Sequence, residues 1–125
     1  MVNLLKSITV YILLLAFLLI IANCGVEDAK KIVMDTTPPD TSITSQPLNL
    51  TNSISATFIF TSTEDGSTFE CQMDSGGYTS CTSPKNYTSL TEGSHTFEIK
   101  ATDAANNTDQ TPASYTWTID TTANV

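Results

Sequence analysis

The stretch that decides the fold is SHTFEIKATD, residues 94–103. Every second position carries a side chain that we place toward a core: His95, Phe97, Ile99 and Ala101. The positions between them are polar or charged. Because successive side chains of a strand point to opposite faces, this alternation predicts a β-strand with one buried and one solvated face.

The same alternation occurs over residues 54–61 and 115–120. Short turn signals separate these runs: Glu64-Asp65-Gly66, Ser75-Gly76-Gly77, Glu92-Gly93 and Asn106-Asn107. They predict seven strands, near 42–46, 54–62, 67–74, 78–83, 86–90, 94–103 and 113–120. Seven short antiparallel strands indicate an all-β, two-sheet sandwich. We expect its core to contain Phe58, Phe60, Phe97, Ile99 and Trp117.

The chain starts with a different kind of segment. A short region with Lys6 is followed by an apolar run over residues 10–22, and then by Cys24. These are the parts of a secretory signal, and 21–25 (IANCG) resembles the lipobox of bacterial lipoproteins, although Asn23 stands where Gly, Ala or Ser is usual. We expect cleavage before Cys24 and lipidation of its thiol. Two alternatives are an uncleaved membrane anchor over 4–22 and an ordinary cleaved signal.

This interpretation divides the chain into a signal peptide over 1–23, expected to be an apolar helix, a lipid-attached polar tether over 24–40, an Ig-like sandwich over 41–120, and the start of a linker or tail over 121–125. The domain would then lie outside the cytoplasm, on an outer or cytoplasmic membrane of the cell envelope. Two or more acyl chains are needed for stable anchoring.

The remaining cysteines, Cys71 and Cys81, are predicted to form a disulfide, because an exported protein meets an oxidising compartment. A hairpin closed on residues 75–77 sets Asp74 opposite Tyr78. Counting outward from that pair places Cys71 directly opposite Cys81.

The charge excludes one class of partner. The net charge is −8, and removal of Lys6 with the leader makes it −9; the sequence has no arginine. Nucleic acid requires clustered Lys and Arg, so we expect no nucleic-acid partner.

Several stretches in order resemble the Ig-like repeat modules of large bacterial surface proteins: DTTPPDTSIT (35–44), STFEC (67–71), CTSP (81–84), LTEGSHTFEIKATD (90–103) and PASYTWTID (112–120). The resemblance implies an immunoglobulin-like or fibronectin-III-like sandwich that is used as a spacer or adhesion module. Asp35-Thr36-Thr37 also returns as Asp120-Thr121-Thr122, as linkers do in tandem arrays.

No pattern in the sequence indicates catalysis. His95 is the only histidine and stands at an inward position, which is typical of a buried, hydrogen-bonded imidazole. Motifs for a nucleophilic serine, a zinc protease or a phosphate loop do not occur, so we expect a protein that is not an enzyme.

Two binding functions stay open as alternatives. One loop contains Asp103, Asn106, Asn107 and Asp109, and the module ends carry Asp35, Asp40 and Asp120. Their carboxylate and amide oxygens suit Ca²⁺, and the weak candidate ligands are Asp103, Asn106 and Asp109. Asp and Asn are equally the usual turn residues. Tyr78 and Tyr87 are the aromatic candidates for a carbohydrate-binding face. We expect a membrane partner through the lipid, and the sequence does not identify a protein or glycan partner.

Overall fold

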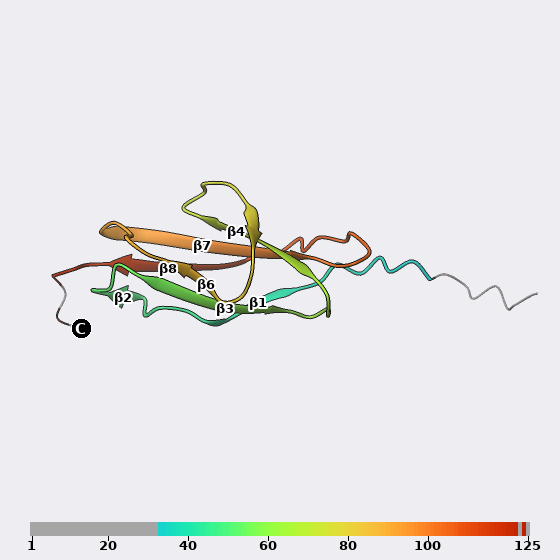
Figure 1. Ribbon diagram of the computed structural model, residues 1–125, viewed down its shortest axis with the longest axis horizontal. Helices are drawn as coiled ribbons and strands as arrows, with labels where there is room; N and C mark the ends of the chain where they lie inside the picture. The colour runs from blue at the N-terminus through green and yellow to red at the C-terminus, as the bar shows by residue number, and fades with distance from the viewer. Residues whose placement is uncertain (1–32, 123, 125) are drawn as a thin grey trace, which may run out of the picture. The chain divides into compact units, whose positions relative to one another are not determined.

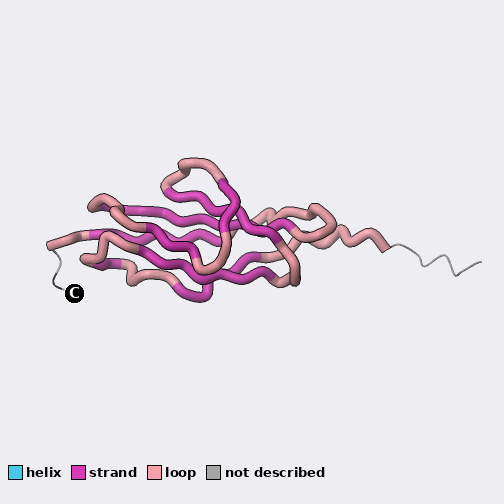
Figure 2. Tube along the Cα trace, viewed as in Figure 1, coloured by secondary structure: helices cyan, strands magenta, loops and turns pink. Residues whose placement is uncertain are grey.

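The computed structural model describes residues 33–122 and 124, so the predicted leader, Cys24 and most of the predicted tether lie outside the described residues. The described part consists of strands and loops and contains no helix (Figure 2). Its strands are β1 (Thr41–Ser45), β2 (Leu50–Thr51), β3 (Ala56–Ser62), β4 (Thr68–Met73), β5 (Thr79–Cys81), β6 (Lys85–Tyr87), β7 (Gly93–Thr102) and β8 (Ala113–Ile119). Consequently, this part of the chain offers no helical segment suited to crossing a bilayer.

The strands form two sheets in a sandwich-like arrangement. One sheet has three strands in the order β1-β3-β6, and the other has five in the order β2-β8-β7-β4-β5. Figure 1 shows β7 and β8 along one layer, and β1 and β3 along the other. The predicted all-β, two-sheet fold is therefore confirmed.

The first part of the domain contributes to both sheets. β1 pairs antiparallel with β3, and after a short crossover β2 pairs parallel with β8. The crossover is held to the second sheet by the Tyr115 hydroxyl, which donates a hydrogen bond to the carbonyl of Pro47 (2.8 Å). The other strand pairs are antiparallel.

The core lies between the inward faces of the two sheets. All five side chains predicted for it are at most 2% exposed: Phe58, Phe60, Phe97, Ile99 and Trp117. Phe58 and Phe97 stack across the sandwich with ring centroids 4.1 Å apart, so the two sheets meet through aromatic rings. On β7 the inward positions 95, 97, 99 and 101 are all buried, which confirms the alternation.

Each predicted segment contains a strand, but the predicted number of seven is wrong for the described residues, which hold eight. The extra strand, β2, has only two residues, too few to produce an alternating pattern. The strand predicted over 54–62 also starts later than expected: β3 begins at Ala56, and Ile54 is 46% exposed.

The register of the β4–β5 hairpin corrects a second expectation. Cys71 stands opposite Thr79, and Cys81 opposite Phe69, so the two cysteines are diagonal neighbours. The turn starts earlier than predicted: Asp74 and Ser75 have positive φ (51° and 59°), and the Gly76 amide donates to the Met73 carbonyl (2.9 Å). The Asp74 amide donates to the Thr96 carbonyl of β7 (2.9 Å), which fixes this end of the turn to β7.

Candidate functional site

The strongest cluster of chemically active side chains lies at the end of the sandwich where β7 finishes. Asp35 precedes β1, Glu64 lies in the turn between β3 and β4, and Asp103 directly follows β7. One carboxylate oxygen from each lies within 4.8 Å of the other two. We call Asp35, Glu64 and Asp103 the acidic cluster.

Asp103 is the most constrained member of the acidic cluster. It is 8% exposed, and it accepts hydrogen bonds from the Asn107 amide (2.8 Å) and the Asn107 side chain (2.7 Å). The same Asn107 side chain donates to the Asp35 carbonyl (3.1 Å). Asn107 therefore ties the segment ahead of β1 to the loop after β7.

The close approach of three carboxylates affects their protonation. Partial burial, followed by the negative charges of Asp35 and Asp103, raises the pKa of Glu64 above its ordinary value. Burial opposes ionisation of Asp103, but hydrogen bonds from the Asn107 side chain and backbone outweigh it and lower the pKa of Asp103. Between these two residues, the repulsion therefore favours protonation of Glu64.

The two described lysines are engaged elsewhere. Lys85 lies over the ring of Tyr87 (5.2 Å), and Lys100 forms an ion pair with Glu70 (3.2 Å). Carboxylate oxygens without a neighbouring Lys or Arg are the ligand type that Ca²⁺ takes. Chemically, the acidic cluster offers three carboxylates whose oxygens can serve as metal ligands.

The three residues that the sequence singled out for calcium have different surroundings in the structure. Asp103 belongs to the acidic cluster. Asn106 is exposed in a left-handed conformation (φ 68°). Asp109 is 4% exposed, and its two oxygens accept hydrogen bonds from Thr41, and from the backbone (2.7 Å) and hydroxyl (3.2 Å) of Thr111.

Glu64 was missed by sequence reasoning, which read its tripeptide only as a turn. A shallow pocket of 280 Å³ adjoins it, lined by Phe60, Phe69 and the turn over 64–67. That volume falls just below the range of ordinary small-molecule sites, about 300–1,000 Å³. The pocket suits at most a small ligand.

The segment that precedes β1 contacts the sandwich. Pro39 is buried. The Asp40 carbonyl accepts from the Thr63 amide (3.0 Å), and the Asp40 amide donates to the Thr63 hydroxyl (2.9 Å). Asp40, the last residue that the sequence assigned to the tether, is thus fastened to the β3–β4 turn.

The other predicted site residues take structural places. Cys71 and Cys81 form a disulfide with a Cα–Cα distance of 5.9 Å. His95 is 6% exposed, and both of its ring nitrogens have hydrogen-bond partners. Tyr87 packs against the core, and the Tyr78 ring lies under the Lys100 ammonium (4.4 Å).

Neither a scan against known protein families nor a search of the curated proteins finds a match for this chain.

Proposed function

We propose that this chain is a non-catalytic lipoprotein of the bacterial cell envelope, with an Ig-like module that serves as a structural spacer or as an adhesion and protein-interaction domain. Lipid at Cys24 holds one end, and the sandwich presents its loops and sheet edges away from the membrane.

The observation that carries this proposal is the path of the chain through the sandwich. Figure 1 shows the described chain entering at one end and leaving at the other. Thr41, at the start of β1, bonds to Asp109, whose amide donates to Ala101 near the end of β7. Ile119, at the end of β8, stands opposite Gly93, the first residue of β7. β7 has 10 residues, so at about 3.3 Å per residue the module separates its two ends by about 30 Å.

The strand order supports an Ig-like topology. The first strand region divides between the sheets, with β1 beside β3 in one and β2 parallel to β8 in the other. The five-stranded sheet continues through β7, β4 and β5. A first strand that changes sheets, with a consecutive antiparallel pair at the chain's end, is the arrangement expected of an Ig-like sandwich.

The linker echo in the sequence also has a structural counterpart. The Asp35 carboxylate accepts a hydrogen bond from the Thr37 amide (2.9 Å), and the Asp120 carboxylate accepts one from the Thr122 amide (2.9 Å). The same turn thus stands before the first strand and after the last. This supports derivation from head-to-tail modules.

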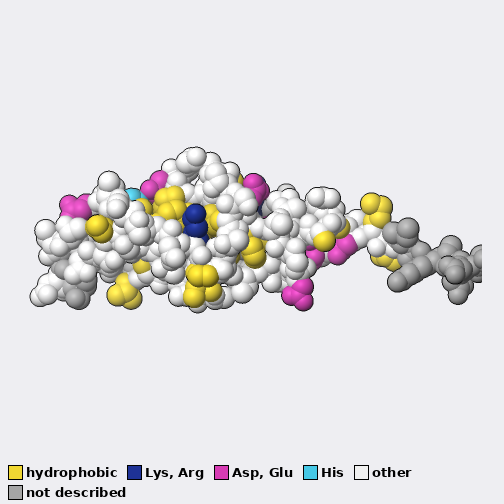
Figure 3. All heavy atoms as spheres, viewed as in Figure 1, with side chains coloured by type: hydrophobic (Ala, Val, Ile, Leu, Met, Phe, Trp, Pro, Cys, Tyr) yellow, Lys and Arg dark blue, Asp and Glu magenta, His cyan; other side chains and the backbone are white. Residues whose placement is uncertain are grey.

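Two further observations favour a non-catalytic role. His95, the only histidine of the sequence, has both ring nitrogens engaged and is therefore not poised as a base. On the face drawn in Figure 3, hydrophobic side chains form separate spots and acidic side chains are dispersed. A polar, patch-free face of this kind suits a solvated spacer.

The spacer function is tested by pulling the full chain from handles placed ahead of residue 33 and after residue 122. We expect a distinct unfolding step whose contour-length gain grows by about 30 Å on reduction, because reduction frees the 10-residue separation that the disulfide spans with a Cα–Cα distance of 5.9 Å. The double variant Cys71→Ala/Cys81→Ala is the matched control, with the longer gain in both conditions. Smooth extension at low force, without a step, would contradict a rigid spacer.

A second candidate function is calcium binding, which the close approach of Asp35, Glu64 and Asp103 favours. Extracellular modules bind Ca²⁺ with Kd values up to about 10⁻³ M, so about 10 mM Ca²⁺ stabilises such a site by about 1.4 kcal/mol. The Tm of the full chain is expected to rise with Ca²⁺ in wild type and in Asp65→Asn, but not in Glu64→Gln. No rise in wild type would reject this candidate.

The carbohydrate alternative has less support. Tyr87 is packed against the core, and one side of Tyr78 is taken by Lys100, so the two rings do not offer a shared platform.

A further inference from the structure

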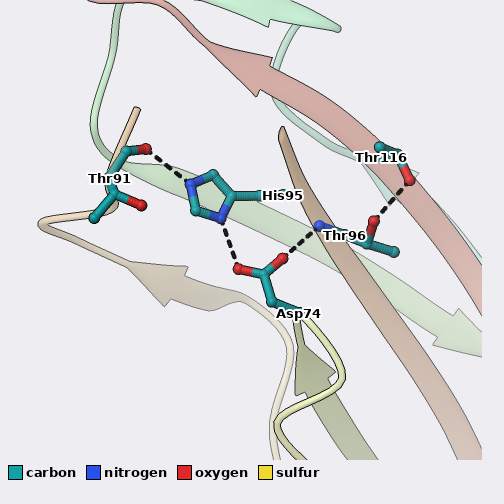
Figure 4. A network of polar contacts seen from close by, with 5 residues as sticks. All are labelled: Asp74, Thr91, His95, Thr96 and Thr116. Carbon is teal, nitrogen blue, oxygen red and sulfur yellow. Dashed lines mark hydrogen bonds and ion pairs between the residues drawn. The ribbon is translucent and has the colours of Figure 1, made fainter. Parts of the chain in front are cut away.

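His95 occupies an unusual position for a titratable group. It points inward from the start of β7 and is 6% exposed. Its Nδ1 lies 2.7 Å from the Asp74 carboxylate, and its Nε2 lies 2.8 Å from the Thr91 carbonyl oxygen (Figure 4). The ring therefore bridges the β4–β5 turn and the connection that leads from β6 into β7.

Both partners of His95 are hydrogen-bond acceptors. A carboxylate and a carbonyl oxygen each require an N–H, and a neutral imidazole carries only one. The neutral ring would turn a lone pair toward one of the two oxygens at hydrogen-bond distance, and the ring itself is nearly shielded from water. The geometry is complete only for the imidazolium, with both nitrogens donating.

Asp74 does more than balance this charge. One carboxylate oxygen accepts from His95, and the other accepts from the Thr96 amide (2.8 Å), while the Asp74 amide donates to the Thr96 carbonyl (2.9 Å). Asp74 thus forms the base of the turn that Figure 1 shows projecting from the two layers. Its left-handed conformation (φ 51°) is uncommon for residues other than glycine, and these hydrogen bonds stabilise it.

We propose that His95 is a proton-operated latch: the imidazolium joins the β4–β5 turn to the β6–β7 connection, and loss of its proton removes one of these two hydrogen bonds and so uncouples the turn from the connection.

The surroundings of His95 leave Asp74 as its ionic partner among the described residues. On the β6–β7 connection, Glu92 bonds instead to Thr121 (3.0 Å). From β8, the uncharged Trp117 ring lies 5.6 Å from the imidazole, and β3 contributes Phe58 behind it (5.2 Å from Trp117). The charge state of the latch is therefore set by one pair.

The direction of the pH dependence follows from the hydrogen bonds. The bond to Thr91, and then the bond to Asp74, raise the pKa of His95 above its ordinary value, although burial opposes this. Stability from a group with a raised pKa is complete below the unfolded value, about 6.5, and is lost as pH rises through the folded value. Burial likewise opposes ionisation of Asp74, but the bonds from His95 and Thr96 lower its pKa, so acid opens the latch only below about pH 3.8. The latch is closed between these limits.

The test follows the titration of His95 in the full chain, kept in neutral detergent. The sequence has a single histidine and a single tryptophan, so their signals are unambiguous. Ring ¹⁵N shifts are expected to show both nitrogens protonated at pH 6, with a titration midpoint above 6.5. The amide signals of Asp74 and Thr96 should move with the same midpoint. Fluorescence of Trp117 should rise over the same range, because an imidazolium quenches indole more strongly than neutral imidazole does.

Asp74→Asn removes the charge and keeps an acceptor oxygen for the Thr96 amide, so the His95 midpoint should fall by one pH unit or more. Asp65→Asn removes an equal charge from an exposed turn and should leave the midpoint unchanged. A wild-type midpoint at or below 6.5, a neutral ring at pH 6, or turn amides that do not follow the histidine would overturn the proposal. The wild-type titration decides the matter even if Asp74→Asn fails to fold.

Discussion

Reduction of the Cys71–Cys81 bond is a direct test of how the edge of the five-stranded sheet is stabilised. β5 pairs with β4, and it has only three residues. Cys71 is 2% exposed and belongs to the core, whereas Cys81 packs against the core from the edge. The bond therefore fastens the outermost strand of this sheet to a buried position.

The size of the effect follows from the length of chain that the bond closes. A sequence separation of 10 residues gives about 2.5–3 kcal/mol in the chain-entropy treatment. For a domain of 60–100 residues, 1 kcal/mol shifts Tm by about 4–8 °C, so reduction should lower Tm by about 10–20 °C. The aromatic core is untouched by reduction, and the sandwich should stay folded at room temperature.

The assay is thermal unfolding of the full chain followed by far-UV circular dichroism, before and after reduction verified by thiol alkylation and mass. Cys71→Ala/Cys81→Ala is the control, since its melting should not respond to reductant. An unchanged Tm after verified reduction would refute the entropic reasoning. Complete unfolding at room temperature would show that the bond, rather than the core, holds the sheets together.

Three further substitutions test individual contacts. Phe58→Ala should lower the free energy of unfolding by about 3–5 kcal/mol in denaturant titrations, because this fully buried ring stacks on Phe97. Thr57→Ala, on the outer face of the same strand, should change it by less than about 0.5 kcal/mol; equal losses would contradict the assigned faces. Asp109→Ala should lower the free energy of unfolding by about 1–3 kcal/mol and raise hydrogen exchange in β1, since it leaves the Thr41 hydroxyl without its acceptor. Gln110→Ala, at an exposed position, is the control, and unchanged protection of β1 would argue against the Thr41–Asp109 bond as its anchor. Tyr115→Phe should cost about 1 kcal/mol by freeing the Pro47 carbonyl, and exchange should rise at β2; a loss spread evenly over all strands would count against this assignment.

Local alternation was sufficient to predict the long strands. In β7 and β8 every second side chain faces the core along the strand, so apolar and polar residues alternate regularly in the sequence. The start of the strand predicted over 54–62 was wrong because alternation does not mark where a strand begins. β2 was missed because its two residues pair with a strand distant in sequence, and Leu50 is 41% exposed.

The hairpin register and the acidic cluster depend on contacts between distant residues. The turn of β4–β5 is set by Asp74, whose partners His95 and Thr96 lie about twenty residues away along the chain. Glu64 meets Asp35 and Asp103 only after three separate turns have been brought to one end of the sandwich. A reading of local patterns identifies each turn, but it contains no information about which turns meet.

The measurement that tests the central claim most directly is the intact mass of the protein recovered from membranes of a bacterial host, beside a Cys24→Ala control. The proposed envelope lipoprotein predicts a mass for residues 24–125 plus diacylglyceryl and acyl groups, absent from the control. A full-length mass without lipid in both samples would contradict it.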